Sequence, residues 1–273
     1  MKACAADRWR IIAASVSGTS HLQNALPCQD AHAFRVLPGG QLLAAVSDGA
    51  GSAEHSQAGA RLAVEQALTA LETLCQCGTP EDEAEWQAEI TSLFDKIHQK
   101  LADCANAADA PLRAFAATLT CALVKDGWLV VGQIGDGAAI VEDTDGALFL
   151  AARPQRDEYA NETHFLTQPD AALRAVVYAA RRQVRALALT TDGLLRLALK
   201  LPAYEPHSQF FQPLLTFARE AADETRAQAE LADFLASERV CARTDDDKTL
   251  LLAVRTESDE RAAILTQGVE AAR

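Results

Sequence analysis

The sequence predicts an α+β fold in which two packed antiparallel β-sheets, a β-sandwich, are flanked by pairs of antiparallel helices in four layers, αββα. Short apolar segments rich in β-branched residues recur through the first half of the chain, with turn signals between them. Two longer segments, 62–74 and 86–101, instead carry apolar residues at three- and four-residue spacings. This spacing is typical of helices that pack one face against a sheet.

The predicted strands of the first half are joined by turns that contain glycine. Pro38-Gly39-Gly40, Asp126-Gly127 and Asp145-Gly146 each separate two apolar segments. Consecutive hairpins favour antiparallel sheets, because a tight turn reverses the chain direction. The predicted strands are 9–16, 31–37, 42–47, 118–124, 128–134, 138–142 and 147–151.

Elements of both kinds follow in the second half. Residues 153–170 have little periodicity and are expected to form an excursion over the surface. Apolar segments at 175–178, 186–191 and 249–254 predict further strands, and helical periodicity predicts helices at 210–222 and 225–237.

Length and composition predict one domain, residues 1–255, with a peripheral C-terminal tail, 256–273. The chain has 273 residues, of which 49% are hydrophobic. Its net charge of -13 disfavours nucleic acid and anionic membrane surfaces as partners. We expect a cytoplasmic protein, because no apolar run reaches the ~18 residues of a spanning helix and no signal sequence opens the chain. The chain has seven cysteines, an odd number that cannot all pair in disulfides, and their spacing forms no zinc motif. We therefore expect reduced thiols.

Four aspartates share one local context at the end of an apolar strand. They stand in AAVSDG (Asp48), VGQIGDG (Asp136), LALTTDG (Asp192) and, before the last strand, DDDKTLLLAV (Asp246). Such residues are held by a rigid sheet, and several of them converging can bind hard cations through oxygen atoms. Each Asp-Gly pair can equally be an ordinary turn, as Asp126-Gly127 illustrates.

The spacing and context of these motifs resemble one known family. The resemblance covers residues 10–255 and is to the metal-dependent protein phosphatases of the protein phosphatase 2C type, in particular a bacterial branch. The motifs that carry it are Gly18-Thr19-Ser20-His21, Pro27-Cys28-Gln29-Asp30, Ala45-Val46-Ser47-Asp48-Gly49-Ala50-Gly51, Ala117-Thr118-Leu119, Gly135-Asp136-Gly137, Tyr159-Ala160-Asn161-Glu162-Thr163, Leu189-Thr190-Thr191-Asp192-Gly193-Leu194 and Asp246-Asp247-Lys248-Thr249.

The resemblance implies a centre of two divalent ions, manganese or magnesium. It implies that Asp48 bridges both ions and that the Gly49 carbonyl adds a ligand to one of them. Asp192 and Asp246 are implied to bind the other ion, and Asp30 to contact the metals directly or through water. These four aspartates, Asp30, Asp48, Asp192 and Asp246, are the predicted catalytic residues, and Asp136 is implied to hold a third, weaker ion with Asp192.

The implied activity is that of a serine/threonine phosphoprotein phosphatase without a phosphoenzyme. Paired cations lower the pKa of a bridging water and screen the phosphate charge during in-line attack. The main alternative is a pseudophosphatase, a module that binds a phosphorylated protein without cleaving it, and a further one is an interaction domain without metal. The expected partners are a phosphorylated protein substrate and, by likeness to the branch, a serine/threonine kinase or its target. We expect a monomer.

The chain departs from the family pattern at two places. Many members carry a phosphate-binding arginine five residues before the first metal aspartate, where this chain has Ala25. His21, Arg153 or Arg156 are the candidate substitutes, and His21 can instead be a loop cap. Eukaryotic members have a proton-donating histidine after the first Asp-Gly, where this chain has Ala50.

Overall fold

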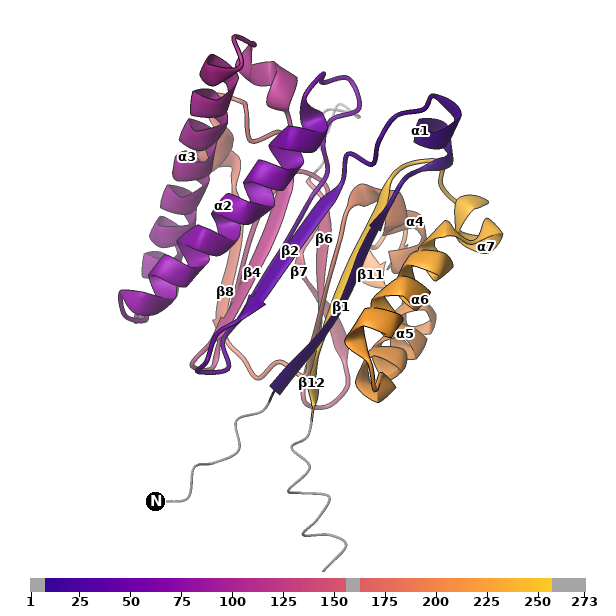
Figure 1. Ribbon diagram of the computed structural model, residues 1–273. Helices are drawn as coiled ribbons and strands as arrows, with labels where there is room; N and C mark the ends of the chain where they lie inside the picture. Colours follow the sequence, from indigo (N-terminus) through magenta and orange to yellow (C-terminus); the bar gives the residue numbers. More distant parts are fainter. Residues whose placement is uncertain (1–7, 156–162, 257–273) are drawn as a thin grey trace, which may run out of the picture.

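The computed structural model describes residues 8–155 and 163–256 (Figure 1). They form two five-stranded antiparallel sheets that pack face to face, with a helix pair on each outer face. The predicted αββα arrangement is confirmed. The prediction of a single domain over 1–255 stays a prediction, and the predicted tail lies almost wholly outside the described residues.

Each sheet is assembled from distant parts of the chain. The first has the strand order β1-β12-β9-β6-β7 and the second β2-β3-β4-β5-β8. The strands of the first sheet are β1 Arg8–Val16, β12 Lys248–Thr256, β9 Ala186–Thr190, β6 Ala138–Glu142 and β7 Leu148–Ala152. Those of the second are β2 Ala31–Val36, β3 Leu42–Ser47, β4 Leu119–Lys125, β5 Trp128–Ile134 and β8 Val176–Arg181.

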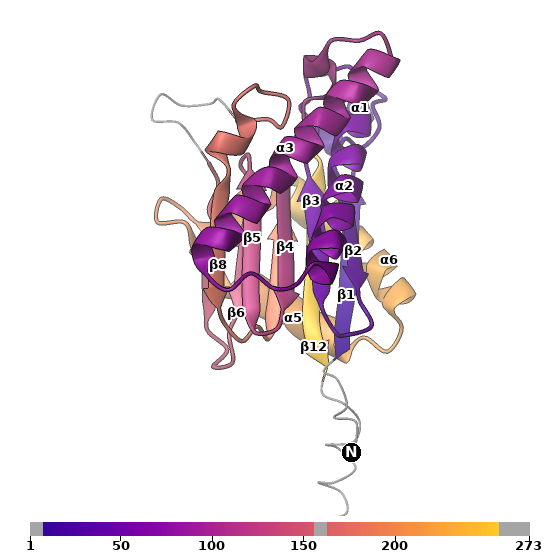
Figure 2. The ribbon, with the colours of Figure 1, turned by 90° about the vertical axis from the view of Figure 1, so that its left-hand side faces the viewer.

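Four long helices cover the sandwich. Helices α2 (Ser56–Gln76) and α3 (Glu83–Ala107) lie on the second sheet, where Figure 2 shows α3 crossing the strands diagonally. Helices α5 (Ser208–Glu220) and α6 (Glu224–Ala236) lie on the first sheet. Two of them begin at a capping aspartate, since Asp82 accepts a hydrogen bond from the Glu85 amide and Asp223 accepts one from the Arg226 amide.

The central strands are apolar on both faces because each face meets a different core layer. In β12, Leu250, Leu252 and Val254 pack under α5 and α6, while Leu251 and Ala253 pack between the two sheets. Successive side chains of a strand point to opposite faces, so a strand buried on both faces has a continuous apolar sequence. This gives a rigid frame whose strand ends can hold polar groups in place.

The structure adds short elements that the sequence did not predict. They span too few residues to show a period. They are α1 Thr19–Gln23, η1 Leu112–Phe115, η2 Ala171–Arg174, η3 Asp192–Leu194, α4 Leu195–Ala198, α7 Glu238–Cys241 and a two-stranded sheet of β10 Leu199–Lys200 and β11 Glu205–Pro206. The predicted strand at 175–178 extends to Arg181. No helix among the described residues has the length and apolar character needed to cross a membrane.

Candidate active site

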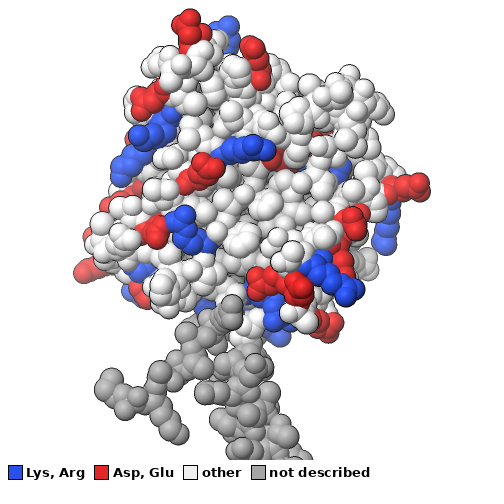
Figure 3. Space-filling view, viewed as in Figure 1, with Lys and Arg blue, Asp and Glu red and all other residues white. Residues whose placement is uncertain are grey.

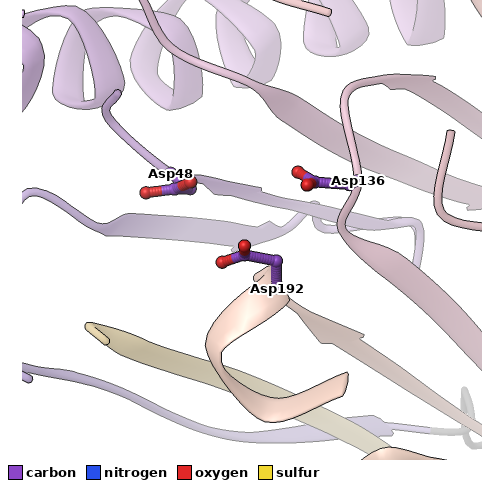
Figure 4. A group of neighbouring side chains, drawn as sticks. All are labelled: Asp48, Asp136 and Asp192. Carbon is purple, nitrogen blue, oxygen red and sulfur yellow. The ribbon is translucent and has the colours of Figure 1, made fainter. Parts of the chain in front are cut away.

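Three of the predicted aspartates meet at one end of the sandwich. Asp48 follows β3 and Asp136 follows β5, both of the second sheet, and Asp192 follows β9 of the first. One carboxylate oxygen from each lies within 4.8 Å of the others, and Figure 4 shows the three side chains gathered from separate strands. Carboxylates far apart in sequence therefore converge where the two sheets adjoin.

The backbone around Asp48 is held by hydrogen bonds from neighbouring segments. The Asp48 amide donates to the Thr118 hydroxyl, at 3.0 Å, and the Gly49 amide donates to the Gln29 carbonyl, at 3.2 Å. A Cβ at Gly49 would lie 2.7 Å from the Ser56 carbonyl oxygen and 2.8 Å from that of Gln29. Only glycine fits between these two backbone segments, which explains the residue after Asp48.

Asp136 sits where the chain crosses from one sheet to the other. Gly135, just before it, has a φ of +110°, a conformation that L side chains rarely adopt. The Thr163 hydroxyl donates a hydrogen bond of 2.9 Å to Oδ2 of Asp136. The turn and this contact together fix the direction of the carboxylate.

Asp30 is a buried carboxylate at the start of β2. Its Oδ2 accepts a hydrogen bond of 2.7 Å from the Thr191 hydroxyl, next to Asp192. Its Oδ1 is buried and has no hydrogen-bond partner among the described residues. Burial raises the pKa of Asp30 to about 7, against the lowering effect of the Thr191 hydroxyl. A buried acceptor without a donor is a position that a cation, directly or through water, would satisfy.

The aspartates repel one another electrostatically. The pKa of Asp48 is raised well above its ordinary value, first by burial and then by the charges of Asp30, Asp192, Asp246 and Asp136. Asp246 is exposed and lines a hollow of about 310 Å³ together with Asp192. Five carboxylates thus act on one small region, which divalent cations would stabilise.

The chemistry of the donor set fits a hard divalent cation. The three converging groups are all carboxylates, with no histidine or cysteine among them. Oxygen ligands suit magnesium and manganese, whereas zinc in proteins favours nitrogen and sulfur. The residues present therefore fit the predicted metals.

A model of the family described as protein phosphatase 2C matches residues 17–236. This chain belongs to the protein phosphatase 2C family. Serine/threonine-protein phosphatase 3 of Escherichia coli (strain K12) is 37% identical over 258 residues, which are 91% of this chain and 99% of that protein. These matches confirm the predicted class of enzyme, a serine/threonine protein phosphatase, and give the pseudophosphatase alternative no support.

Solved structures show the same fold at low identity. Serine/threonine phosphatase Stp1 from Staphylococcus aureus has a TM-score of 0.62 and 13% identity, with 94% of this chain and 100% of that chain covered. The catalytic domain of the serine threonine protein phosphatase PstP, in complex with two manganese ions, has a TM-score of 0.57 and 17% identity, with 91% and 99% covered. The protein phosphatase 2C fold accounts for the whole sandwich.

The phosphatase also has a buried aspartate, Asp247, for which the sequence analysis predicted no role. Asp247 Oδ1 accepts a hydrogen bond of 2.7 Å from the Gly18 amide, and its Oδ2 accepts one of 2.6 Å from the Gln29 amide. Its side chain is 1% exposed, although its neighbours Asp245 and Asp246 are exposed. Asp247 thereby fixes both ends of the 18–29 segment that leads to Asp30.

The predicted phosphate-binding residues have other contacts in this structure. His21 Nδ1 lies 2.8 Å from Oδ1 of Asp247, a distance that fits an ion pair when the ring is protonated. The Arg153 guanidinium lies over the Tyr204 ring, 4.5 Å from its centroid. Arg156 and residues 159–162 of the 159–163 motif lie outside the described residues. A phosphate role for His21 or Arg153 stays a prediction.

Proposed function

We propose that this protein hydrolyses serine and threonine phosphomonoesters on proteins with manganese or magnesium ions held by its aspartate cluster. The observation that carries the proposal is the convergence of Asp48, Asp136 and Asp192 beside the buried Asp30. The PstP structure with manganese ions in the same fold supports it. Asp48, the Gly49 carbonyl, Asp192, Asp246, Asp30 and Asp136 would hold the ions.

The protein positions the oxygen atoms, and the metals supply the electrostatics. Divalent cations held here would lower the pKa of a water molecule and offset the charge of the substrate phosphate. Thr163 and Thr191 orient Asp136 and Asp30 through their hydroxyl groups. Supporting contacts of this kind keep ligands in place before the ion arrives.

The thiol of Cys28, close in sequence to Asp30, is a poor candidate for a nucleophile. Cys28 lies two residues from Asp30, and its pKa is raised to about 12, mainly by burial and further by the charges of Asp30 and Asp247. A thiol that stays protonated at neutral pH is a poor nucleophile. The thiol is therefore not expected to form a covalent intermediate.

Hydrolysis of an aryl phosphate and of a phosphothreonine peptide, each with and without manganese, tests the proposal. We expect turnover of both substrates that depends on the metal and is lost in a chelator. Binding of the phosphopeptide without any hydrolysis in manganese would instead favour the pseudophosphatase.

Without divalent ions, we expect the stability contribution of Asp30 to fall as pH rises. Its pKa is about 7 in the folded protein and about 3.9 in an unfolded chain, so between these values the folded state binds more protons. Protons bound preferentially by the folded state stabilise it, and this stabilisation is lost as pH rises through the interval. Thermal melts of the wild type and of Asp30→Asn in a chelator, at several pH values, measure this loss of stability.

The variant should gain stability relative to the wild type as pH rises from about 4 to about 7, because it removes the titrating group. Saturating manganese should reduce the wild-type loss, since cations bind the ionised carboxylates. A stability difference between the two proteins that is constant with pH would contradict the assigned pKa.

The cellular setting is also part of the proposal. The six cysteines of the described residues are all unpaired, which fits a reducing cytoplasm. We propose a monomer in bacterial signalling, whose substrate is a serine/threonine kinase or a protein that such a kinase phosphorylates. Comparison of phosphoproteins in cells with and without the active enzyme tests this assignment.

A further inference from the structure

One hollow adjoins the aspartate cluster, and a second hollow shares a lining residue with it. The first, of about 310 Å³, is lined by Asp192 and Asp246 together with Arg196, Arg243 and Tyr204. The second, of about 640 Å³, is lined by Arg153, Arg174 and the same Tyr204. A shared tyrosine makes them neighbouring parts of one surface that begins at the proposed metal ligands.

Arginine side chains in these hollows are available to bind anions. The guanidinium groups of Arg196 and Arg243 make no hydrogen bond or ion pair with the described residues. Arg153 contacts the Tyr204 ring and has no acidic partner among the described residues, whereas Arg174 is paired with Asp170 at 2.7 Å. The first hollow thus holds two unpaired cations beside the carboxylates proposed to bind metal, with the exposed Asp245 as its remaining acid.

Unpaired arginines beside an acidic cluster stand out in a protein that is acidic overall. The chain has a net charge of -13, and on the face in Figure 3 basic and acidic side chains alternate in small groups. An arginine guanidinium binds carboxylate and phosphate groups through two parallel hydrogen bonds. Unpaired arginines next to a phosphate-hydrolysing centre therefore match a substrate with further acidic groups.

The backbone holds Tyr204 in an unusual conformation between the two hollows. Its φ is +59°, which is rare for a bulky side chain. The residue lies between β10 and β11, which pair with each other, and Arg153 stacks on its ring. Strained positions persist where the surrounding structure fixes them, and they are frequent at ligand sites.

We propose that the two hollows form a substrate-binding groove in which Arg196, Arg243 and Arg153 bind acidic groups close to the phosphorylated residue of a protein. The inference rests on the proposed phosphatase function and adds a substrate class to it. The acidic groups are Asp or Glu side chains or a second phosphate.

Three phosphothreonine peptides of otherwise identical sequence test the proposal. One carries glutamate on both sides of the phosphothreonine, one carries glutamine there, and one carries a phosphoserine. In manganese, kcat/KM of the wild type should be about tenfold higher for the glutamate peptide than for the glutamine peptide, the factor expected for one charge-assisted hydrogen bond. The ratio should fall as salt is added, because these arginines are exposed. The phosphoserine peptide shows whether a second phosphate is preferred to a carboxylate.

Single variants locate the effect. Arg196→Gln and Arg243→Gln should each reduce the ratio of kcat/KM between the glutamate and glutamine peptides several-fold, because each variant removes one charge-assisted contact. Arg185→Gln is the matched control, because the Arg185 side chain is also exposed and has no partner among the described residues. Arg185 precedes β9 and therefore lies at the opposite end of this strand from Asp192. It should keep the wild-type ratio.

Equal kcat/KM for the glutamate and glutamine peptides would overturn the groove while leaving the phosphatase function in place. So would an unchanged ratio in both arginine variants. Hydrolysis of the aryl phosphate but of none of the peptides would overturn the protein-substrate assignment together with the groove.

Discussion

Asp48→Asn is expected to abolish turnover while the fold survives. Asp48 is the carboxylate that the charges of four other aspartates act upon, and it is the proposed ligand of both ions. Its loss should lower kcat/KM by more than about 100-fold, the upper end of the range for residues that only support a metal ligand. Hydrolysis of an aryl phosphate over a range of manganese concentrations measures the loss.

The stability of this variant separates a lost ligand from a lost fold. Without metal, Asp48→Asn should melt at the same temperature as the wild type or higher, because it removes a charge that is buried among like charges. Asp145→Asn is the matched control, an exposed aspartate before glycine outside the cluster, and should retain full activity. Near-full activity of Asp48→Asn in manganese would refute its assignment.

Asp247→Asn is expected to cause the largest loss of stability. The carboxylate is 1% exposed and accepts hydrogen bonds from the backbone amides of Gly18 and Gln29. Asparagine offers one acceptor oxygen in place of two, so a charge-assisted hydrogen bond is lost and a buried amide is left unpaired, which together cost about 3–5 kcal/mol. At about 2–4 °C per kcal/mol for a domain of this size, the melting temperature should fall by roughly 10 °C.

The neighbouring Asp246→Asn variant is the natural comparison. Asp246 is exposed, and its Oδ1 accepts a hydrogen bond from the Asp247 amide that an asparagine oxygen can also accept. We expect Asp246→Asn to retain the wild-type melting temperature and to lose activity. Asp247→Asn should instead have a lower melting temperature than the wild type. Equal melting temperatures for both variants would contradict the structural role of Asp247.

The sequence predicts the frame and the converging aspartates because both leave local signals. A strand buried on two faces is apolar throughout, as in β12, and an Asp-Gly pair after such a strand marks the point where the chain leaves the sheet. Asp48 and Asp192 show that pattern, and the structure brings them together with Asp136. The short helices and the β10–β11 pair leave no comparable signal, because they contain too few residues to show a repeating pattern of apolar positions.

The residues that the sequence did not reveal depend on distant contacts. Residues 245–247 are three consecutive aspartates, and nothing in their sequence distinguishes them. Only the third, Asp247, is buried and accepts hydrogen bonds from the backbone amides of Gly18 and Gln29. Arg196 and Arg243 look like ordinary surface arginines until the fold places them in one hollow with Asp192. Arg181 and Arg182 are exposed as well, and only the fold shows that they stack over Trp128 and Phe149.

A crystal grown with manganese tests the central claim most directly. Anomalous scattering locates the ions without reference to activity. We expect peaks in the space enclosed by Asp48, Asp136 and Asp192, with at least one ion bonded to an Asp48 oxygen. Ordered aspartates at saturating manganese with no anomalous peak among them would contradict the account.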